Sequence, residues 1–257
     1  MRSLPAFLKK ELLEQYRSGK VMLLGLLFVL LGIMNPAIAK LTPWLLETMA
    51  DSLAESGMVV TGVTVSAMDS WVQFYKNLPI GLIAFILVES SIFTREYQTG
   101  TLILALTKGL SRYKVVISKT VVLTGLWTLG YWLCFGVTYI YNAYFWDNAV
   151  ASHLLFSAGC WWGFGLWVIM LTVLFSVASQ TNTGVLTGTG GVVLVSYLLG
   201  FFPKVKSYLP TALSDGNSLI YGVTKPGDYL WPLAVAAVMA VTCFAVSIPV
   251  FAKKKLS

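Results

Sequence analysis

Long apolar segments of membrane-crossing length alternate along this chain with shorter polar segments that carry most of its charge. A helix that crosses a bilayer needs roughly 20 consecutive, mostly apolar residues. Residues 154–203 contain no charge, which is too long for one span, and the polar run at 179–183 divides them. The pattern predicts six membrane spans, over residues 19–39, 71–93, 115–142, 154–178, 184–202 and 229–251.

The N-terminal segment 1–18 shows a second pattern, with apolar residues at helical spacing and charged residues mostly between them. The apolar positions are Leu4, Phe7, Leu8, Leu12 and Leu13, and the charged ones are Lys9, Lys10 and Glu14. This arrangement predicts an amphipathic helix that lies in the inner membrane interface. Such a helix is either a plain anchor before the first span or a lateral helix that contacts a cytosolic partner.

The connector between the second and third spans, residues 94–113, predicts a short interfacial helix on the same side. Gly100 marks a turn, and an apolar stripe at helical spacing follows it at Leu102, Ile103, Leu106 and Leu110. On the opposite side, residues 203–228 contain proline and glycine breaks and are predicted to form an extracellular segment. The first outer loop, roughly residues 40–70, is acidic, and residues 61–65 within it are predicted to be extended.

Composition agrees with a lipid-solvated protein: 57% of the residues are hydrophobic, 11% are charged and the mean hydropathy is +0.76. The predicted fold is therefore an all-α integral membrane protein, with residues 1–257 forming a single transmembrane domain. The three cysteines fall within predicted spans without CxxC spacing and are interpreted as apolar packing residues.

The distribution of Lys and Arg predicts the orientation, because basic flanks stay on the cytoplasmic side during insertion. Of the 18 basic residues, most belong to the termini and the 94–113 connector, including their span ends. These are Arg2, Lys9, Lys10, Arg17, Lys20, Arg95, Lys108, Arg112, Lys114, Lys119, Lys253, Lys254 and Lys255, against Lys40, Lys76, Lys204, Lys206 and Lys225 on the other side. Both termini are predicted to be cytoplasmic in a multi-pass cell-membrane protein. The net charge of +7 is thereby explained without nucleic-acid binding.

Catalytic and metal-binding patterns are missing from the sequence. The single histidine, His153, cannot supply a multi-histidine metal site or a histidine-based triad by itself, so neither catalytic nor metal-ligand residues are predicted. The phosphate-binding pattern GxxxxGK[ST] does not occur, so ATP and Mg²⁺ are not expected to bind to this chain. We therefore predict that the chain is not an enzyme by itself.

Three features inside the predicted spans leave alternatives open. Glu89 is either a proton or cation site or a carboxylate near the headgroups that pairs with a basic residue. Gly184 and the glycines at 188, 190 and 191 form a small-residue face for packing within the chain or for a dimer contact. Aromatic residues around the third and fourth spans, such as Trp127 and Trp161, suit either a hydrophobic cargo or anchoring at the interface.

The 94–113 connector contains the run Arg95-Glu96-Tyr97-Gln98-Thr99-Gly100-Thr101-Leu102, followed by Ser111-Arg112 and Lys119. This run is similar to the acidic-xxx-Gly-Thr-Leu connector, with its Ser-Arg pair and following Lys, of the membrane-spanning permease subunits of type-2 ABC exporters. The resemblance also covers the whole layout, from amphipathic N-terminal helix through six spans to a basic tail. Gly109-Leu110 departs from it, because many members have a proline before the Ser-Arg pair.

The resemblance implies that 94–113 contains a cytoplasmic coupling helix that inserts into a separate ABC ATPase subunit. It identifies Arg95, Glu96, Gly100, Thr101 and Arg112 as candidate residues for binding that ATPase. It also implies an assembly of two ATPases, which bind ATP and Mg²⁺, with two permeases as a homodimer or heterodimer. The expected function is export of a hydrophobic or amphipathic cargo, such as a peptide antibiotic, across a bacterial plasma membrane. The alternatives are an ion-coupled transporter or channel, for which Glu89 would matter, and a membrane scaffold.

Overall fold

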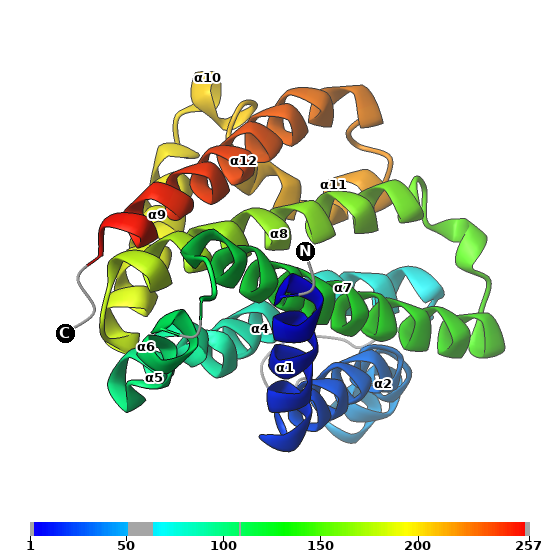
Figure 1. Ribbon diagram of the computed structural model, residues 1–257. Helices are drawn as coiled ribbons and strands as arrows, with labels where there is room; N and C mark the ends of the chain where they lie inside the picture. The colour runs from blue at the N-terminus through cyan, green and yellow to red at the C-terminus, as the bar shows by residue number, and fades with distance from the viewer. Residues whose placement is uncertain (1–2, 51–63, 108, 255–257) are drawn as a thin grey trace.

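The computed structural model describes residues 3–50, 64–107 and 109–254, and the described residues form helices without strands (Figure 1). The predicted all-α fold and the predicted number of six membrane-crossing helices are confirmed. Residues 61–65, which were predicted to be extended, lie mostly outside the described residues. The long helices are α2 (Lys20–Thr48), α4 (Ala67–Glu89), α7 (Arg112–Phe145), α8 (Leu154–Ala178), α9 (Asn182–Leu199) and α12 (Leu230–Lys253).

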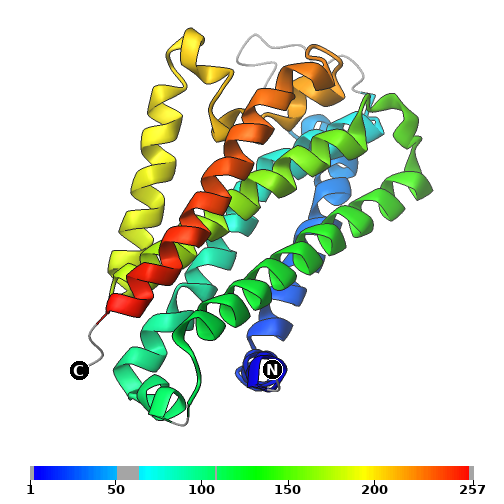
Figure 2. The same cartoon turned by 45° about the horizontal axis from the view of Figure 1, so that its top comes forward.

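The long helices form two groups that meet at α8. Helices α2, α4 and α7 pack together on one side, and α9 and α12 pack against α8 on the other (Figure 2). The short helices α1 (Ser3–Arg17), α5 (Ser91–Thr99) and α6 (Thr101–Thr107) lie at the end of the bundle where α12 also ends. This end therefore brings together segments from both halves of the chain.

Several helices extend beyond the segments that hydropathy predicted. Helix α2 continues to Thr48 through Pro36 and Pro43, where the sequence predicted an end at residue 39. Helix α7 has 34 residues, or about 51 Å at 1.5 Å per residue, which exceeds the roughly 30 Å hydrocarbon core of a bilayer. Its first turns, which include Lys119, thus continue beyond the apolar run on the side of α1 and α5. Charges and prolines in the sequence indicate where an apolar run ends, but α2 and α7 remain helical past them.

The core between the two groups is built from aromatic side chains. Trp127 and Tyr131 of α7 and Trp161 of α8 are almost completely buried. Their polar atoms have partners: the Tyr131 hydroxyl donates to the Ala158 carbonyl at 2.7 Å, and the Trp161 indole N–H donates to the Ser214 carbonyl at 2.9 Å. The Trp127 and Tyr131 ring centroids are 5.5 Å apart. These aromatic residues therefore stabilise helix packing and do not form an interfacial belt.

The segment between α9 and α12 folds back onto the N-terminal part of α8, near Ser157 and Trp161. It comprises α10 (Pro203–Lys206), η2 (Pro210–Ser214), α11 (Gly216–Ile220) and η3 (Pro226–Tyr229), and the α7–α8 connection contains η1 (Asn148–Val150). Leu213, Leu219 and Ile220 are fully buried. The Ser157 hydroxyl donates to the Gly216 carbonyl at 3.1 Å, which joins α8 to α11. The segment closes the end of the bundle opposite α5.

Glycines allow the closest helix contacts. A Cβ atom on Gly188 of α9 would lie 2.3 Å from the Phe175 ring of α8, so this glycine serves packing within the chain. A Cβ atom on Gly190 or Gly191 would have no neighbouring atom within 4 Å, so the face of α9 at these two glycines is open. The Gly165 position on α8 is the tightest against the core, because its Cβ would lie 2.2 Å from the Trp127 ring.

We predict that Gly165→Ala lowers the free energy of unfolding by about 1–3 kcal/mol, because the added methyl group must displace a fully buried tryptophan. Unfolding in mixed detergent micelles, followed by tryptophan fluorescence, measures the change. The matched control is Gly159→Ala on the same helix, where a Cβ meets no atom within 4 Å. That control should be neutral or slightly stabilising, and equal losses in the two variants would contradict the packing argument.

Candidate functional site

Helix α5 is the meeting point of several helix ends and contains Arg95 and Glu96, two of the five residues that the sequence grouped as a candidate ATPase-binding site. It continues α4 after a single turn residue, Ser90, so the predicted boundary between second span and connector at residue 93 falls inside α5. Gly100 ends the helix with a φ of 67°, a left-handed conformation that glycine adopts without steric cost. Helix α6 starts directly after it. The glycine turn predicted from the sequence is therefore present.

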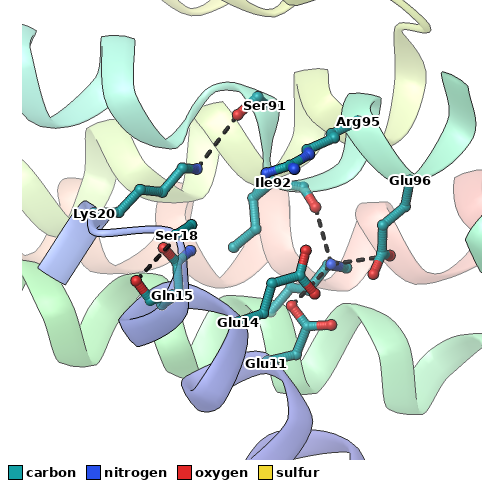
Figure 3. A pocket seen from close by; sticks show the side chains of 10 residues that line it. Glu11, Glu14, Gln15, Ser18, Lys20, Ser91, Ile92, Arg95 and Glu96 are labelled. Carbon is teal, nitrogen blue, oxygen red and sulfur yellow. Dashed lines mark hydrogen bonds and ion pairs between the residues drawn. The ribbon is translucent and has the colours of Figure 1, made fainter. Parts of the chain in front are cut away.

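A network of buried charges joins α5 to α1 and α7. The side chain of Lys119 on α7 is 1% exposed, and its Nζ lies 2.9 Å from Glu11 Oε2 and 3.0 Å from Glu96 Oε2. It also donates to the Ile92 carbonyl at 2.9 Å. Lys10 Nζ lies 2.5 Å from Glu96 Oε1 and 3.0 Å from Glu11 Oε1. Figure 3 shows Glu11, Glu14 and Glu96 around this cluster.

The three carboxylates of Glu11, Glu14 and Glu96 have oxygens within 4.8 Å of one another, which is close enough for a shared cation. The ammonium groups of Lys10 and Lys119 already lie among them and supply the compensating positive charge. Buried charges require such pairing, because each loses several kcal/mol of hydration. The cluster is therefore a set of ion pairs between helices.

The charge state of the exposed part of this network holds across neutral pH. Burial alone would lower the pKa of Lys10, but hydrogen bonds to Glu14 and Glu96 and the charge of Glu11 raise it above the ordinary value. Burial would raise the pKa of Glu14, but the hydrogen bond and charge of Lys10 lower it. The contribution of Lys10 to the stability of the fold is lost only as the pH rises through its raised pKa. The contribution of Glu14 to that stability is lost only as the pH falls through its lowered pKa.

Glu89, at the end of α4, belongs to a second polar group beside the first. It is fully buried, accepts a hydrogen bond from Gln15 Nε2 at 2.7 Å and has Lys20 Nζ at 3.6 Å. Lys20 also donates to the Ser91 hydroxyl at 3.3 Å (Figure 3). The carboxylate is thus held by residues at the end of α1 and the start of α2.

Helix α1 turns its polar positions inward. Phe7, Glu11 and Gln15 form its buried face, spaced four residues apart, and contact the bundle. Leu12 and Leu13 are 49% and 44% exposed, so the apolar stripe predicted from the sequence is split between the two sides. The reason is that Glu11 pairs with Lys119 on α7 and Gln15 donates to Glu89 on α4, contacts that leucine cannot replace.

Two cations hold the C-terminal ends of helices near α5. Arg112 Nη1 donates to the carbonyls of Phe251, Ala252 and Lys254 at 2.7–3.0 Å at the end of α12. Lys254 Nζ donates to the carbonyls of Val177 and Ser179 at 2.8 and 2.6 Å at the end of α8. Cations are favourable there because these carbonyls have no helical partner and carry the negative end of the helix dipole.

The structure thus divides the five residues that the sequence grouped as an ATPase-binding site. Glu96 and Arg112 are engaged by contacts within the chain, and Arg95 is exposed and extends towards the end of α1 (Figure 3). Gly100 and Thr101 lie at the α5–α6 turn, where Thr101 is exposed. Lys10, Glu11, Gln15 and Lys254 were not identified as site residues. The signal available in the sequence was the pair Glu11 and Gln15, polar residues placed one and two turns after Phe7.

We predict that Lys119→Met lowers the free energy of unfolding by about 3–5 kcal/mol, because it removes the buried one of the two cations that Glu11 and Glu96 share and leaves only the half-exposed Lys10. Adding Glu11→Gln and Glu96→Gln to Lys119→Met should recover at least half of the loss. The matched control, Lys9→Met, changes an exposed lysine of α1 outside the network. Reversible unfolding in mixed micelles provides the measurement. If the triple variant were less stable than Lys119→Met, unpaired charge would not be the cause.

Comparison with known proteins places the chain in a family. Residues 6–221 match the ABC-2 family transporter protein model. The chain is also similar to YxlG of Bacillus subtilis (strain 168), described as an uncharacterized transmembrane protein, with 23% identity over 265 residues that cover 96% of each chain. No solved structure shows a significant match. Since the family match covers most of the chain, including α1, the charge network and the α5–α6 turn, this protein belongs to the ABC-2 family of transporter membrane proteins.

Proposed function

We propose that this chain is the permease subunit of an ATP-driven exporter, and that α6 is the coupling helix that docks onto a separate ABC ATPase. The observation that supports the proposal most is the arrangement of α5 and α6. A seven-residue helix with exposed Thr101 and Ile103 follows a glycine turn, and the helix before that turn contacts segments from both halves of the bundle.

The connections of α5 explain how a movement of α6 would reach the spans. Ion pairs and a backbone hydrogen bond join α5 to α1 and α7. The Thr94 hydroxyl is hydrogen-bonded to Asn182, the first residue of α9. The rings of Phe93 and Tyr97 have centroids 6.1 and 6.4 Å from that of Phe251 on α12. A docked ATPase that displaced α6 would therefore shift the spans α7, α9 and α12, together with the flanking helix α1, at their ends near α5.

In this proposal Glu96 and Arg112 position the coupling unit, and Gly100, Thr101 and Ile103 belong to the part that meets the ATPase. Glu96 is locked between two lysines, and Arg112 binds the end of α12. Two ATPases would bind ATP and Mg²⁺, and their closure would supply the free-energy difference between the two states of the permease, since a ligand shifts an equilibrium only through differential affinity. Both termini would lie in the cytoplasm of a bacterial cell.

The proposed cargo is hydrophobic or amphipathic, such as a peptide antibiotic. Support comes from a cavity of about 240 Å³ between α4, α8 and α9, whose lining is mostly apolar. Thr189 lines this cavity with a buried hydroxyl that has no hydrogen-bond partner among the described residues. Helices α9 and α12 expose apolar side chains such as Leu194 and Val241, a surface suited to lipid or to a second permease subunit.

We predict that Ile103→Glu reduces association with the ATPase at least tenfold, because a carboxylate would replace an apolar side chain at the centre of the docking helix. The tagged permease is purified from its native cells in mild detergent, and bound subunits are quantified by mass spectrometry.

The matched control is Val223→Glu, an exposed position in the segment between α9 and α12, which should retain the ATPase. Equal retention of the ATPase by the two variants would reject α6 as the docking helix. Wild-type permease that retains no subunit carrying GxxxxGK[ST], even after crosslinking, would reject the exporter proposal itself.

A further inference from the structure

A cleft of about 500 Å³ lies between α1 and α5 and has no role in the proposed coupling. It is lined by Lys10, Leu13, Glu14, Arg17, Ser18 and Arg95, and is called here the α1–α5 cleft. Arg95 enters it from α5, and Arg17 and Ser18 enter it from the end of α1. Gly19 then turns the chain into α2 with a φ of 74°, which fixes Arg17 beside the start of the first span.

The charges in this cleft do not cancel. Glu14 lies 2.7 Å from Lys10 Nζ and also interacts with the charge of Arg95, and it is one carboxylate against the three cations of the lining. Among the described residues, neither Arg17 nor Arg95 forms an ion pair, and both side chains are exposed. Two guanidinium groups therefore face one cleft with an excess of positive charge. A guanidinium fork matches the oxygens of a phosphate through paired, charge-assisted hydrogen bonds.

The surroundings of the cleft indicate that the phosphate belongs to a lipid. Leu13 contributes to the lining itself, and Leu12 and Tyr16 are exposed on the same helix, so an apolar surface adjoins the two arginines. Lys20 begins the apolar helix α2 three residues after Arg17. The arginines thus lie at the level where the chain enters the bilayer, which is the level of the lipid phosphates. Basic side chains in such positions attract anionic lipids.

We propose that the α1–α5 cleft binds the phosphate headgroup of an anionic phospholipid, with Arg17 and Arg95 as its ligands and the acyl chains against Leu12 and Leu13. The bound lipid would join α1 to α5 from the outside, next to the buried ion pairs that join them from the inside. This site requires neither the ATPase nor ATP, so it stands or fails independently of the exporter function.

The experiment uses the purified full-length permease without its partner. Binding of short-chain phosphatidylglycerol is measured by native mass spectrometry and by the shift of the unfolding temperature, with short-chain phosphatidylcholine and inorganic phosphate as parallel probes. Wild-type protein should prefer phosphatidylglycerol. Arg17→Gln with Arg95→Gln should weaken its binding about 25-fold, which corresponds to about 1 kcal/mol for each basic side chain.

Two further variants make the result specific. Lys9→Gln removes an exposed charge of α1 outside the cleft and should leave lipid binding within twofold of wild type. Arg17→Lys with Arg95→Lys keeps the charge but loses the fork, and should give intermediate binding.

The proposal would be overturned by unchanged lipid binding in the double glutamine variant, or by an equal loss in Lys9→Gln. Inorganic phosphate that binds as tightly as phosphatidylglycerol would assign the cleft to a free anion. Loss of ATPase association in the double glutamine variant, with lipid binding intact, would assign the cleft to the protein partner.

Discussion

The ammonium group of Lys119 is held between the carboxylates of Glu11 and Glu96, and the arrangement of the end of the bundle formed by α1 and α5 depends on that contact. A charge that is 1% exposed stays ionised only where opposite charges replace its hydration. The three residues come from α7, α1 and α5, so satisfying one charge fixes the relative positions of three helices. If any of the three moved away alone, at least one buried charge would lose an ion pair.

The same requirement accounts for the inward polar face of α1. An amphipathic helix in water buries its leucines, but α1 buries Glu11 and Gln15 and leaves Leu12 and Leu13 exposed. Lipid around the bundle removes the penalty for exposed leucines, whereas the carboxylates and the amide gain partners only inside. Polar contacts thus become the specific contacts between helices, since apolar packing hardly distinguishes protein from lipid.

At the middle of the bundle the constraint is steric. The buried rings of Trp127, Tyr131 and Trp161 join α7 to α8, and Gly165 gives Trp127 the space it needs. This rigid centre lies between the charge network at one end and the folded segment α10–η3 at the other. In the proposed coupling, a displacement at α5 would be transmitted through helix ends that are held by directional contacts, and the aromatic core would support those ends.

The sequence by itself determined the class of the fold, because a bilayer of fixed thickness requires apolar segments of a minimum length, and the described part of the chain contains six of them. It also located the α5–α6 turn, since Gly100 is a local signal. Only the tertiary structure decided which charges meet: Glu11 and Lys119 are 108 positions apart, Lys10 and Glu96 are 86 apart, and hydropathy carries no information on such pairs. It likewise showed that Glu96 and Arg112 are bound within the chain, because a side chain's partner depends on how distant helices pack.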